Sequence, residues 1–301
     1  MQSSLMDRYI KQILARLQAD GGFQFSPKGG SRPDATAWAI FYLENSGFGP
    51  DFLNRSRDYL VRYQLEDGRV SIDLEHPEAF WLTPLAIFAW QDSAVHERFY
   101  NKAVQFILNS SGEHWPKQPN SPLKHDPEIR GWPWIDHTHS WVPSTAINLM
   151  ALYHAGKSHH PRVKEATSLL LDRQLPHGGW NYGNTEVFGQ ELRPSPEDTG
   201  AALTALVGQT SETHVSKSLE YLLNQVEILR TPIALGWTLI GLSSWDKRPP
   251  DMKIQILDTF ERGNRFGEYD TPSLCLLLIA NDATRGLHRL IRERHRSPSI
   301  R

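Results

Sequence analysis

The feature of this sequence that most constrains its fold is an internal repeat of helix pairs. In each unit, a helix with one apolar face leads through a loop of variable length into a helix of small and apolar residues. A turn that contains glycine follows the first helix in every unit but the fifth, residues 215–242, whose loop is too short to hold it. The clearest copy covers residues 169–206. Its turn contains Gln174, Gly178 and Trp180, and its second helix follows Thr199. Repeats of this kind indicate stacked units that bury their apolar faces against one another.

Six such pairs can be traced along the chain. The first helices are expected at 5–17, 52–63, 99–108, 162–173, 215–226 and 252–260, and the second at 33–43, 86–90, 146–154, 199–207, 233–242 and 273–280. The first helices have one polar side, which is typical of outer helices, whereas the second are apolar nearly all round and are therefore inner helices. An open array would expose its terminal inner helices. The pattern therefore predicts an all-α fold, a closed (α/α)6 toroid of six outer and six inner helices.

Two local features follow from this pattern. In the fourth outer helix, Arg162 and Arg173 fall on the polar side, opposite the apolar positions, and are expected to face solvent. In the third unit, Ser144 and Thr145 stand just before the inner helix, where their hydroxyl groups are expected to act as N-caps.

The 301 residues are expected to form a single domain, with a basic C-terminal helix and tail from about residue 283. No charge run and no Ser/Gly-rich linker divides the chain. The formal net charge of −2 gives no electrostatic reason to expect a nucleic-acid partner. A lone cysteine, Cys275, excludes an intramolecular disulfide and a multi-cysteine zinc site.

Charged residues interrupt the N-terminal apolar pattern at Asp7 and Arg8, which argues against a signal peptide. No other stretch is long and apolar enough to predict a spanning helix. We therefore expect a cytoplasmic protein, with peripheral contact with a membrane left open.

Acidic residues recur close to the expected starts of the inner helices. The candidates for catalysis are Glu197, Asp198, Asp34 and Asp136. Because these starts surround one mouth of a closed ring, the side chains could converge there. The alternative is structural, since acids at helix starts accept backbone N–H bonds and suit the positive end of the helix dipole. Glu197 and Asp198 form the strongest pair, because adjacent carboxylates can separate their pKa values and leave one protonated.

Aromatic and histidine side chains gather in the loops beside glycine. The candidates for substrate binding are Trp132, Trp134, His137, His139, Trp141, Trp180 and Tyr182. If they face the cavity, they form an apolar, π-rich wall that suits an isoprenoid chain or a carbocation; otherwise they pack beneath the loops. The spacing of His137 and His139 is not a recognised zinc pattern, so we expect no metal and no cofactor.

The turn residues also resemble those of a known superfamily. The fragment 166–180, with Gln174, Gly178 and Trp180, resembles the glutamine-tryptophan turn of squalene and hopene cyclases. Weaker copies lie at 17–23 and 63–68, and the segment 131–152 is similar to repeats of the same superfamily, which includes protein prenyltransferase β-subunits. The resemblance implies an α/α toroid with six inner helices around a hydrophobic cavity.

The chemical residues of that superfamily are matched only in part. Class II terpene cyclases protonate their substrate with the middle Asp of an Asp-x-Asp-Asp motif that precedes Thr-Ala. Alignment on the threonine places Asp34 or Glu197 at this middle position, with Asp198 as the last acid of the second copy. The Asp-x-Cys zinc pair of prenyltransferases is missing, because Ser273 stands two residues before Cys275.

These observations predict a terpene-cyclase-like protein that binds a polyisoprenoid or similar apolar molecule and cyclises or isomerises it by acid catalysis. Glu197 and Asp198 are the expected acid and its partner. Two alternatives stay open: a non-enzymatic toroid that binds a lipid or a partner protein, and a subunit similar to the prenyltransferase β-subunit. The sequence leaves the substrate length and the oligomeric state open.

Overall fold

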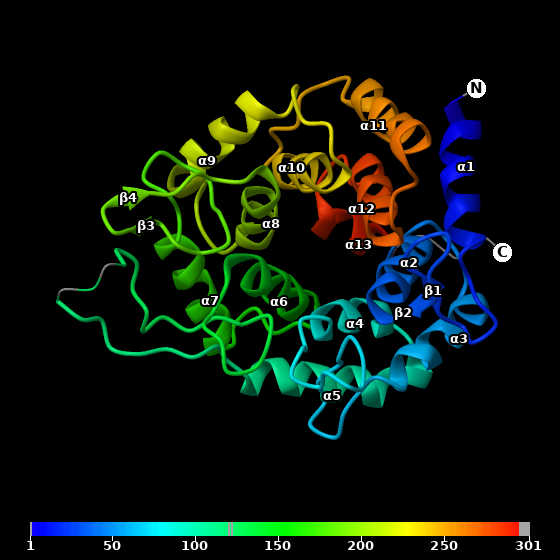
Figure 1. The fold of residues 1–301 in the computed structure, drawn as a ribbon, viewed down its shortest axis with the longest axis horizontal. Helices are drawn as coiled ribbons and strands as arrows, with labels where there is room; N and C mark the ends of the chain where they lie inside the picture. The colour runs from blue at the N-terminus through cyan, green and yellow to red at the C-terminus, as the bar shows by residue number, and fades with distance from the viewer. Residues whose placement is uncertain (1, 120, 122, 295–301) are drawn as a thin grey trace.

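A computed structural model describes residues 2–119, 121 and 123–294, and helices in this part of the chain form two concentric rings (Figure 1). The inner helices are α2 (Pro33–Asn45), α4 (Thr83–Trp90), α6 (Val142–His154), α8 (Pro196–Leu206), α10 (Pro232–Ser244) and α12 (Thr271–Asp282). The outer helices are α1 (Gln2–Leu14), α3 (Pro50–Val61), α5 (Glu97–Asn109), α7 (Pro161–Asp172), α9 (Glu212–Gln225) and α11 (Lys253–Phe266). The last inner helix, α12, packs against α2 and closes the ring. The predicted (α/α)6 toroid is therefore confirmed.

The remaining elements are short. Two antiparallel hairpins, β1 (Phe23–Gln24) with β2 (Ser31–Arg32) and β3 (Glu186–Val187) with β4 (Gln190–Glu191), lie in loops, and the 3-10 helix η1 (Ala94–His96) precedes α5. The expected C-terminal helix is α13 (Leu287–Arg294), whereas residues 295–301 of the expected tail lie outside the described residues. No helix in the described part of the chain is long and apolar enough to cross a membrane.

Burial separates the inner helices from the outer ones, as the sequence predicts. Every residue of α4 is buried, whereas α7 buries mainly the face that contains Val163, Ala166 and Leu169. The expectation for Arg162 and Arg173 is wrong, because both are buried. The Arg162 guanidinium lies 4.1 Å from the ring centroid of a loop tryptophan and donates to backbone carbonyl groups of the loop. A long arginine stem can cover apolar surface while its five donors satisfy carbonyl groups.

A threonine near the start of an inner helix holds the turn before it in several units. The hydroxyl oxygens of Thr36, Thr83, Thr145 and Thr199 accept hydrogen bonds from the backbone N–H groups of Phe23, Val70, Trp132 and Trp180, at 2.8, 2.9, 3.1 and 2.9 Å respectively. Each bond joins the residue after the glycine turn to an inner helix. The same threonine hydrogen bond therefore recurs in four units of the ring.

This bond also corrects the capping prediction for the third unit. The helix α6 begins at Val142, before Ser144 and Thr145, so neither residue is its N-cap. The Thr145 hydroxyl accepts from the backbone of Trp132, and the Ser144 hydroxyl donates to the carbonyl of Pro133 at 2.7 Å. The tertiary bonds to the long loop replace the local capping bonds.

The glycine turns fit beneath the next outer helix. Gly21, Gly68 and Gly178 have positive φ angles of 92°, 98° and 97°. A Cβ atom at these positions would lie 2.5, 2.3 and 2.5 Å from backbone carbonyl oxygens of α3, α5 and α9. Only glycine combines this backbone conformation with so close an approach. Each of these turns therefore packs directly against the backbone of the outer helix in the following unit.

Thr199→Val should destabilise the fold by about 1 to 3 kcal/mol, because it leaves the buried Trp180 N–H without its acceptor. Thr204→Val is the matched control. Thr204 lies on the same helix and is equally buried, but its hydroxyl donates only to the Gly200 carbonyl within α8. Urea unfolding measures both variants, and an equal loss of stability in the two would contradict the role of Thr199.

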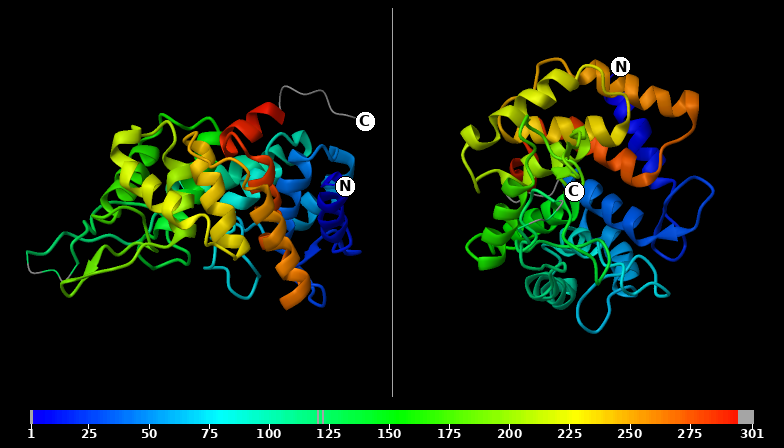
Figure 2. Two further views of the ribbon diagram at one scale, coloured as in Figure 1. Left: turned by 90° about the horizontal axis from the view of Figure 1, so that it is seen from above. Right: turned by 60° about the vertical axis from the view of Figure 1, so that its left-hand side comes forward.

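The short helix α13 lies over the end of the ring opposite the loops that enter the inner helices (Figure 2). His288 of α13 is buried, and its Nε2 atom donates to the Thr204 carbonyl at 3.1 Å. Its Nδ1 atom lies 2.8 Å from Nε2 of His154 and accepts that hydrogen bond. Burial lowers the pKa of His288 to about 4. The neutral imidazole therefore joins α13 to two inner helices.

The pKa of His288 predicts an acid-sensitive fold. The group is neutral in the folded state and takes up a proton with a pKa of 6.5 when unfolded, so its contribution to stability is complete above about pH 6.5 and is lost as the pH falls to about 4. His288→Phe should make the free energy of unfolding less dependent on pH in this window. His159→Gln, at an exposed histidine, should keep the wild-type profile. Identical profiles for wild type and His288→Phe would contradict the assignment.

Candidate functional site

Aromatic side chains fill part of the interior of the ring. The rings of Trp38 from α2 and Trp237 from α10 meet edge to face, with centroids 6.3 Å apart. From Trp38 the contacts continue through Phe41 and Phe88 to His154, near the end that α13 covers. These aromatic contacts therefore extend through the interior toward the end that α13 covers.

Asp34, at the start of α2, forms an ion pair. Its two carboxylate oxygens accept from Nε and Nη2 of Arg32 at 2.8 and 2.5 Å, and its side chain is almost fully buried. The Arg32 guanidinium also lies 3.6 Å from the ring centroid of Phe25. Because the guanidinium holds both oxygens, Asp34 serves to fix the loop before α2.

Asp136 lies in the long loop before α6 and is half-buried. Its Oδ2 atom is 3.3 Å from Nη1 of Arg69, and its backbone N–H donates to the Glu78 carbonyl at 2.9 Å. These bonds join the loops of the second and third units. Both the carboxylate and the backbone N–H of Asp136 therefore bond to the loop of the second unit.

Asp198, on the first turn of α8, is the acid with a perturbed pKa at the mouth. Burial raises its pKa to about 6; the hydrogen bond from Ser195 opposes this shift, and the charge of Glu197 adds to it. The Ser195 hydroxyl donates to Oδ2 of Asp198 at 2.6 Å, and the backbone N–H of Asp198 donates to the same hydroxyl at 3.2 Å. Both acids are half-buried. Asp198 therefore titrates closer to neutral pH than an ordinary aspartate does.

Two of the predicted substrate-binding residues lie in the core instead. Trp132 and Trp180 are fully buried, and their indole N–H groups donate to the carbonyls of Ile107 and Leu170 at 2.8 and 2.6 Å. Each ring packs beneath its glycine turn and bonds the preceding outer helix. Because neither ring has an exposed face, neither can contact a ligand in the mouth. Both residues instead follow the structural alternative, in which loop aromatics pack beneath the turns.

The other predicted aromatic residues are more accessible. Trp134 packs edge to face on Trp81, with centroids 5.9 Å apart. His139 lies on Trp141, which contacts Tyr182, at centroid distances of 4.0 and 5.6 Å. Tyr182 is 46% exposed, and Trp134 and Trp141 are half-buried. These side chains keep open faces that a ligand can contact.

His137 lies exposed at the surface. It has a positive φ of 58°, its side chain is 87% exposed, and its Nδ1 atom lies 4.0 Å from a carboxylate oxygen of Glu113. Across the described ranges, no group of three or more His, Cys, Asp or Glu side chains is arranged to hold a metal ion.

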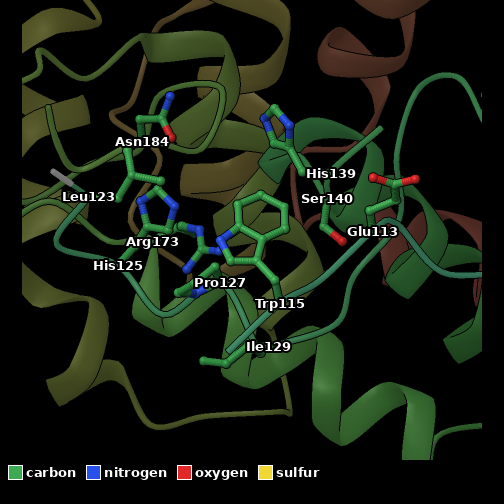
Figure 3. A pocket seen from close by; sticks show the side chains of 10 residues that line it. All are labelled: Glu113, Trp115, Leu123, His125, Pro127, Ile129, His139, Ser140, Arg173 and Asn184. Atoms are coloured by element: carbon green, nitrogen blue, oxygen red, sulfur yellow. The ribbon is translucent and has the colours of Figure 1, made fainter. Parts of the chain in front are cut away.

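Beside the mouth lies a cavity that the sequence reasoning missed. Its volume is about 240 Å³, and Trp115, His125 and His139 from the long loop line it together with Arg173 and Asn184 (Figure 3). Of these, the sequence predicts only His139. The concentration of tryptophan and histidine in residues 114–139 was the available signal. The folding of the loop back over the end of α7 was not apparent from it.

With this geometry in place, the fold identifies the chain as an α/α toroid. No family model matches the chain. A protein from Actinoplanes has a TM-score of 0.61 at 14% identity, covering 94% of this chain and 99% of that one. The α-1,6-mannanase GH76A from a Salegentibacter species has a TM-score of 0.62 at 12% identity, with 93% and 98% covered.

A type II terpene cyclase from Scytonema is similar at a TM-score of 0.52 and 12% identity, covering 93% of this chain and 96% of that one. In sequence, the chain is 33% identical to enfumafungin synthase from Hormonema carpetanum over 104 residues, which is 30% of this chain. The match spans only 8% of that synthase. The fold is thus terpene-cyclase-like and also shared with a mannanase.

The raised pKa of Asp198 predicts how the stability of the fold depends on pH. A carboxyl group whose folded pKa is raised stabilises the fold fully below its unfolded pKa, and this contribution is lost as the pH rises through about 6. Asp198→Asn should therefore be more stable than wild type at pH 7 to 8, by about 2 kcal/mol, with no difference below about pH 4. Asp51→Asn, at an exposed acid on the first turn of α3, should give no such gain. Thermal unfolding across this pH range measures the effect, and a pH-independent difference would refute it.

Proposed function

We propose that this protein is a terpene-cyclase-like toroid that binds a short isoprenoid or similar apolar molecule at the mouth of its ring and uses Asp198 as a general acid. The observation that carries the proposal is the raised pKa of Asp198, about 6, at the start of an inner helix. A general acid works best when its pKa lies near the operating pH. The charge of Glu197 and burial supply this shift.

The aromatic side chains support an apolar ligand. Trp134, Trp141 and Tyr182 keep accessible faces, and the rings of Trp38 and Trp237 meet edge to face in the interior. Aromatic faces bind apolar chains and stabilise positive charge. Because the Trp38–Trp237 contact limits the depth, the proposed ligand is short or enters only with part of its chain.

The acid strength of Asp198 limits the functional groups that it can protonate. A carboxyl group with a pKa of about 6 is a weaker acid than an ordinary aspartic acid. It suits the protonation of a hydroxyl or epoxide oxygen better than that of a carbon–carbon double bond. We therefore propose an isoprenoid alcohol or epoxide as the substrate, with ionisation of its C–O bond as the first step. Proton transfer from Asp198 breaks the C–O bond, so that water leaves from an alcohol or the oxygen of an opened epoxide stays on the product as a hydroxyl group. An internal double bond then attacks the cation, and proton loss to the Asp198 carboxylate would complete a cyclisation.

The comparisons agree with this class of ligand without establishing it. The Scytonema protein of similar fold is a type II terpene cyclase, and enfumafungin synthase matches part of the chain. Asp34 contributes differently from the acid of an intact Asp-x-Asp-Asp motif, since Arg32 holds both of its oxygens. This difference is the reason that the proposal rests on Asp198.

Incubation of the purified protein with farnesol, geranylgeraniol, a squalene epoxide and squalene itself tests the proposal by mass spectrometry of the products. We expect conversion of an oxygen-bearing substrate and none of squalene. Asp198→Asn should lower turnover by about 10² to 10⁴, the usual contribution of a general acid. Asp51→Asn is the control at an exposed acid and should keep full turnover. Undiminished turnover in Asp198→Asn would eliminate Asp198 as the acid.

A second function, non-enzymatic lipid binding, is favoured by a specific pair of observations. The Arg32–Asp34 ion pair removes one candidate acid, and the Trp38–Trp237 contact fills the depth that a long substrate would need. A binder needs the aromatic surface and not the proton donor. Native mass spectrometry distinguishes the two functions, because a lipid retained unmodified by both wild type and Asp198→Asn, with no turnover, supports the binder.

A further inference from the structure

The cavity beside the mouth has one apolar side and one polar side. Trp115, Leu123, Pro127 and Ile129 supply apolar surface, and Figure 3 shows the Trp115 indole beside the Arg173 guanidinium. Glu113 lies at the other side of this view, paired with the exposed His137. At about 240 Å³, the cavity is smaller than the usual range of about 300 to 1,000 Å³ for drug-sized ligands. It therefore suits a molecule of roughly one ring with a short substituent.

His125 supplies the polar feature that points to a ligand. It is only 7% exposed although it lines the cavity, and its buried Nδ1 atom has no hydrogen-bond partner among the described residues. A buried polar atom left unpaired costs about 1 to 3 kcal/mol. Because the atom itself is buried, a ligand in the cavity reaches it only when the imidazole ring turns, and a hydrogen bond formed in this way would recover much of that cost.

The charge around His125 selects the kind of ligand. Burial and the positive charge of Arg173 together lower its pKa to about 4, and the same two causes lower the pKa of His139. Both imidazoles are therefore neutral at neutral pH, in the field of a cation. The groups that act on the pKa of His125 are Arg173, His139 and Lys117, with Asp126 acting in the opposite direction. Two further acids lie nearby: Glu113 lines the cavity, and Asp172 is paired with Arg173.

Arg173 is fixed in place for this role. Its side chain is 5% exposed, and its guanidinium is paired with Asp172 and donates to the Asp126 carbonyl at 3.0 Å. A cationic ligand would meet the charge of Arg173, whereas an anionic one would be attracted and would favour the protonated form of His125. Carboxylates are planar acceptors that match both groups.

We infer that this cavity binds a small monocarboxylate with an apolar or aromatic body, which places its carboxylate at His125 and Arg173 and its body against Trp115. The site lies beside the ring mouth and uses none of the acids of the proposed reaction. Carboxylate binding accompanies proton uptake by His125, because the anion favours the imidazolium. Binding should therefore be tighter at lower pH within the range in which the protein is folded.

Isothermal titration calorimetry of the full chain with benzoate, 3-phenylpropionate and indole-3-acetate tests the inference, with benzamide and benzylamine as matched neutral and cationic probes. We expect the carboxylates to bind at least 10-fold more tightly than these two. In buffers of different ionisation enthalpy, the measured heat should differ in the direction of proton uptake. Equal affinity for benzoate and benzamide, or no binding of any carboxylate at millimolar concentration, would overturn the inference.

Variants separate this site from its surroundings. His125→Phe and Trp115→Ala should each weaken carboxylate binding by at least 10-fold, and the second variant remains informative if the first fails to fold because Trp115 is 42% exposed. His159→Gln, at an exposed histidine that does not line the cavity, should bind as wild type. Asp198→Asn should also bind normally, so failure of the proposed reaction and failure of this site are distinguishable. Wild-type affinity in a folded Trp115→Ala or His125→Phe protein would refute the placement.

Discussion

The close contact between each glycine turn and the backbone of the next outer helix is the constraint on which the ring depends. At Gly178, a Cβ atom would lie 2.5 Å from the Lys217 carbonyl oxygen, so the two segments can meet only without a side chain. The Thr199 hydroxyl then holds the residue after the turn to the inner helix. Equivalent contacts at Gly21 and Gly68 position the outer helices α3 and α5 in the same way. The apolar inner helices are thereby brought together and buried.

A second close approach shapes the interior. A Cβ atom on Gly200 would lie 2.2 Å from the carbonyl oxygen of Trp237, and one on Gly241 would lie 2.8 Å from that of Gly200. The two inner helices α8 and α10 therefore pack at nearly backbone contact. This packing accompanies the meeting of the Trp237 and Trp38 rings in the interior. Asp198 lies on the first turn of α8, at the end of the ring where the inner helices begin.

Two polar groups in this protein are held in states that weaken the fold. Burial raises the pKa of Asp198, so its ionised form is disfavoured, and the buried Nδ1 atom of His125 lacks a partner among the described residues. Strongly perturbed titratable groups in concave regions are candidates for function. In contrast, Asp34 is fully paired with Arg32, and its geometry is explained by structure alone. The raised pKa of Asp198 and the ion pair of Asp34 thus distinguish two acids that the sequence places at equivalent helix starts.

The sequence by itself determined the closed ring, because the period of its helix pairs and the all-apolar inner helices are local patterns that only one packing buries. It also located the glycine turns through Gln174, Gly178 and Trp180. Only the tertiary structure decided which side chains are accessible: Trp132 and Trp180 bond preceding helices, and Arg162 is buried against the long loop. The cavity beside the mouth likewise depends on where residues 113–139 fold, since His125 and Arg173 belong to different segments. Such contacts join residues far apart in the chain, and no periodicity in the sequence encodes them.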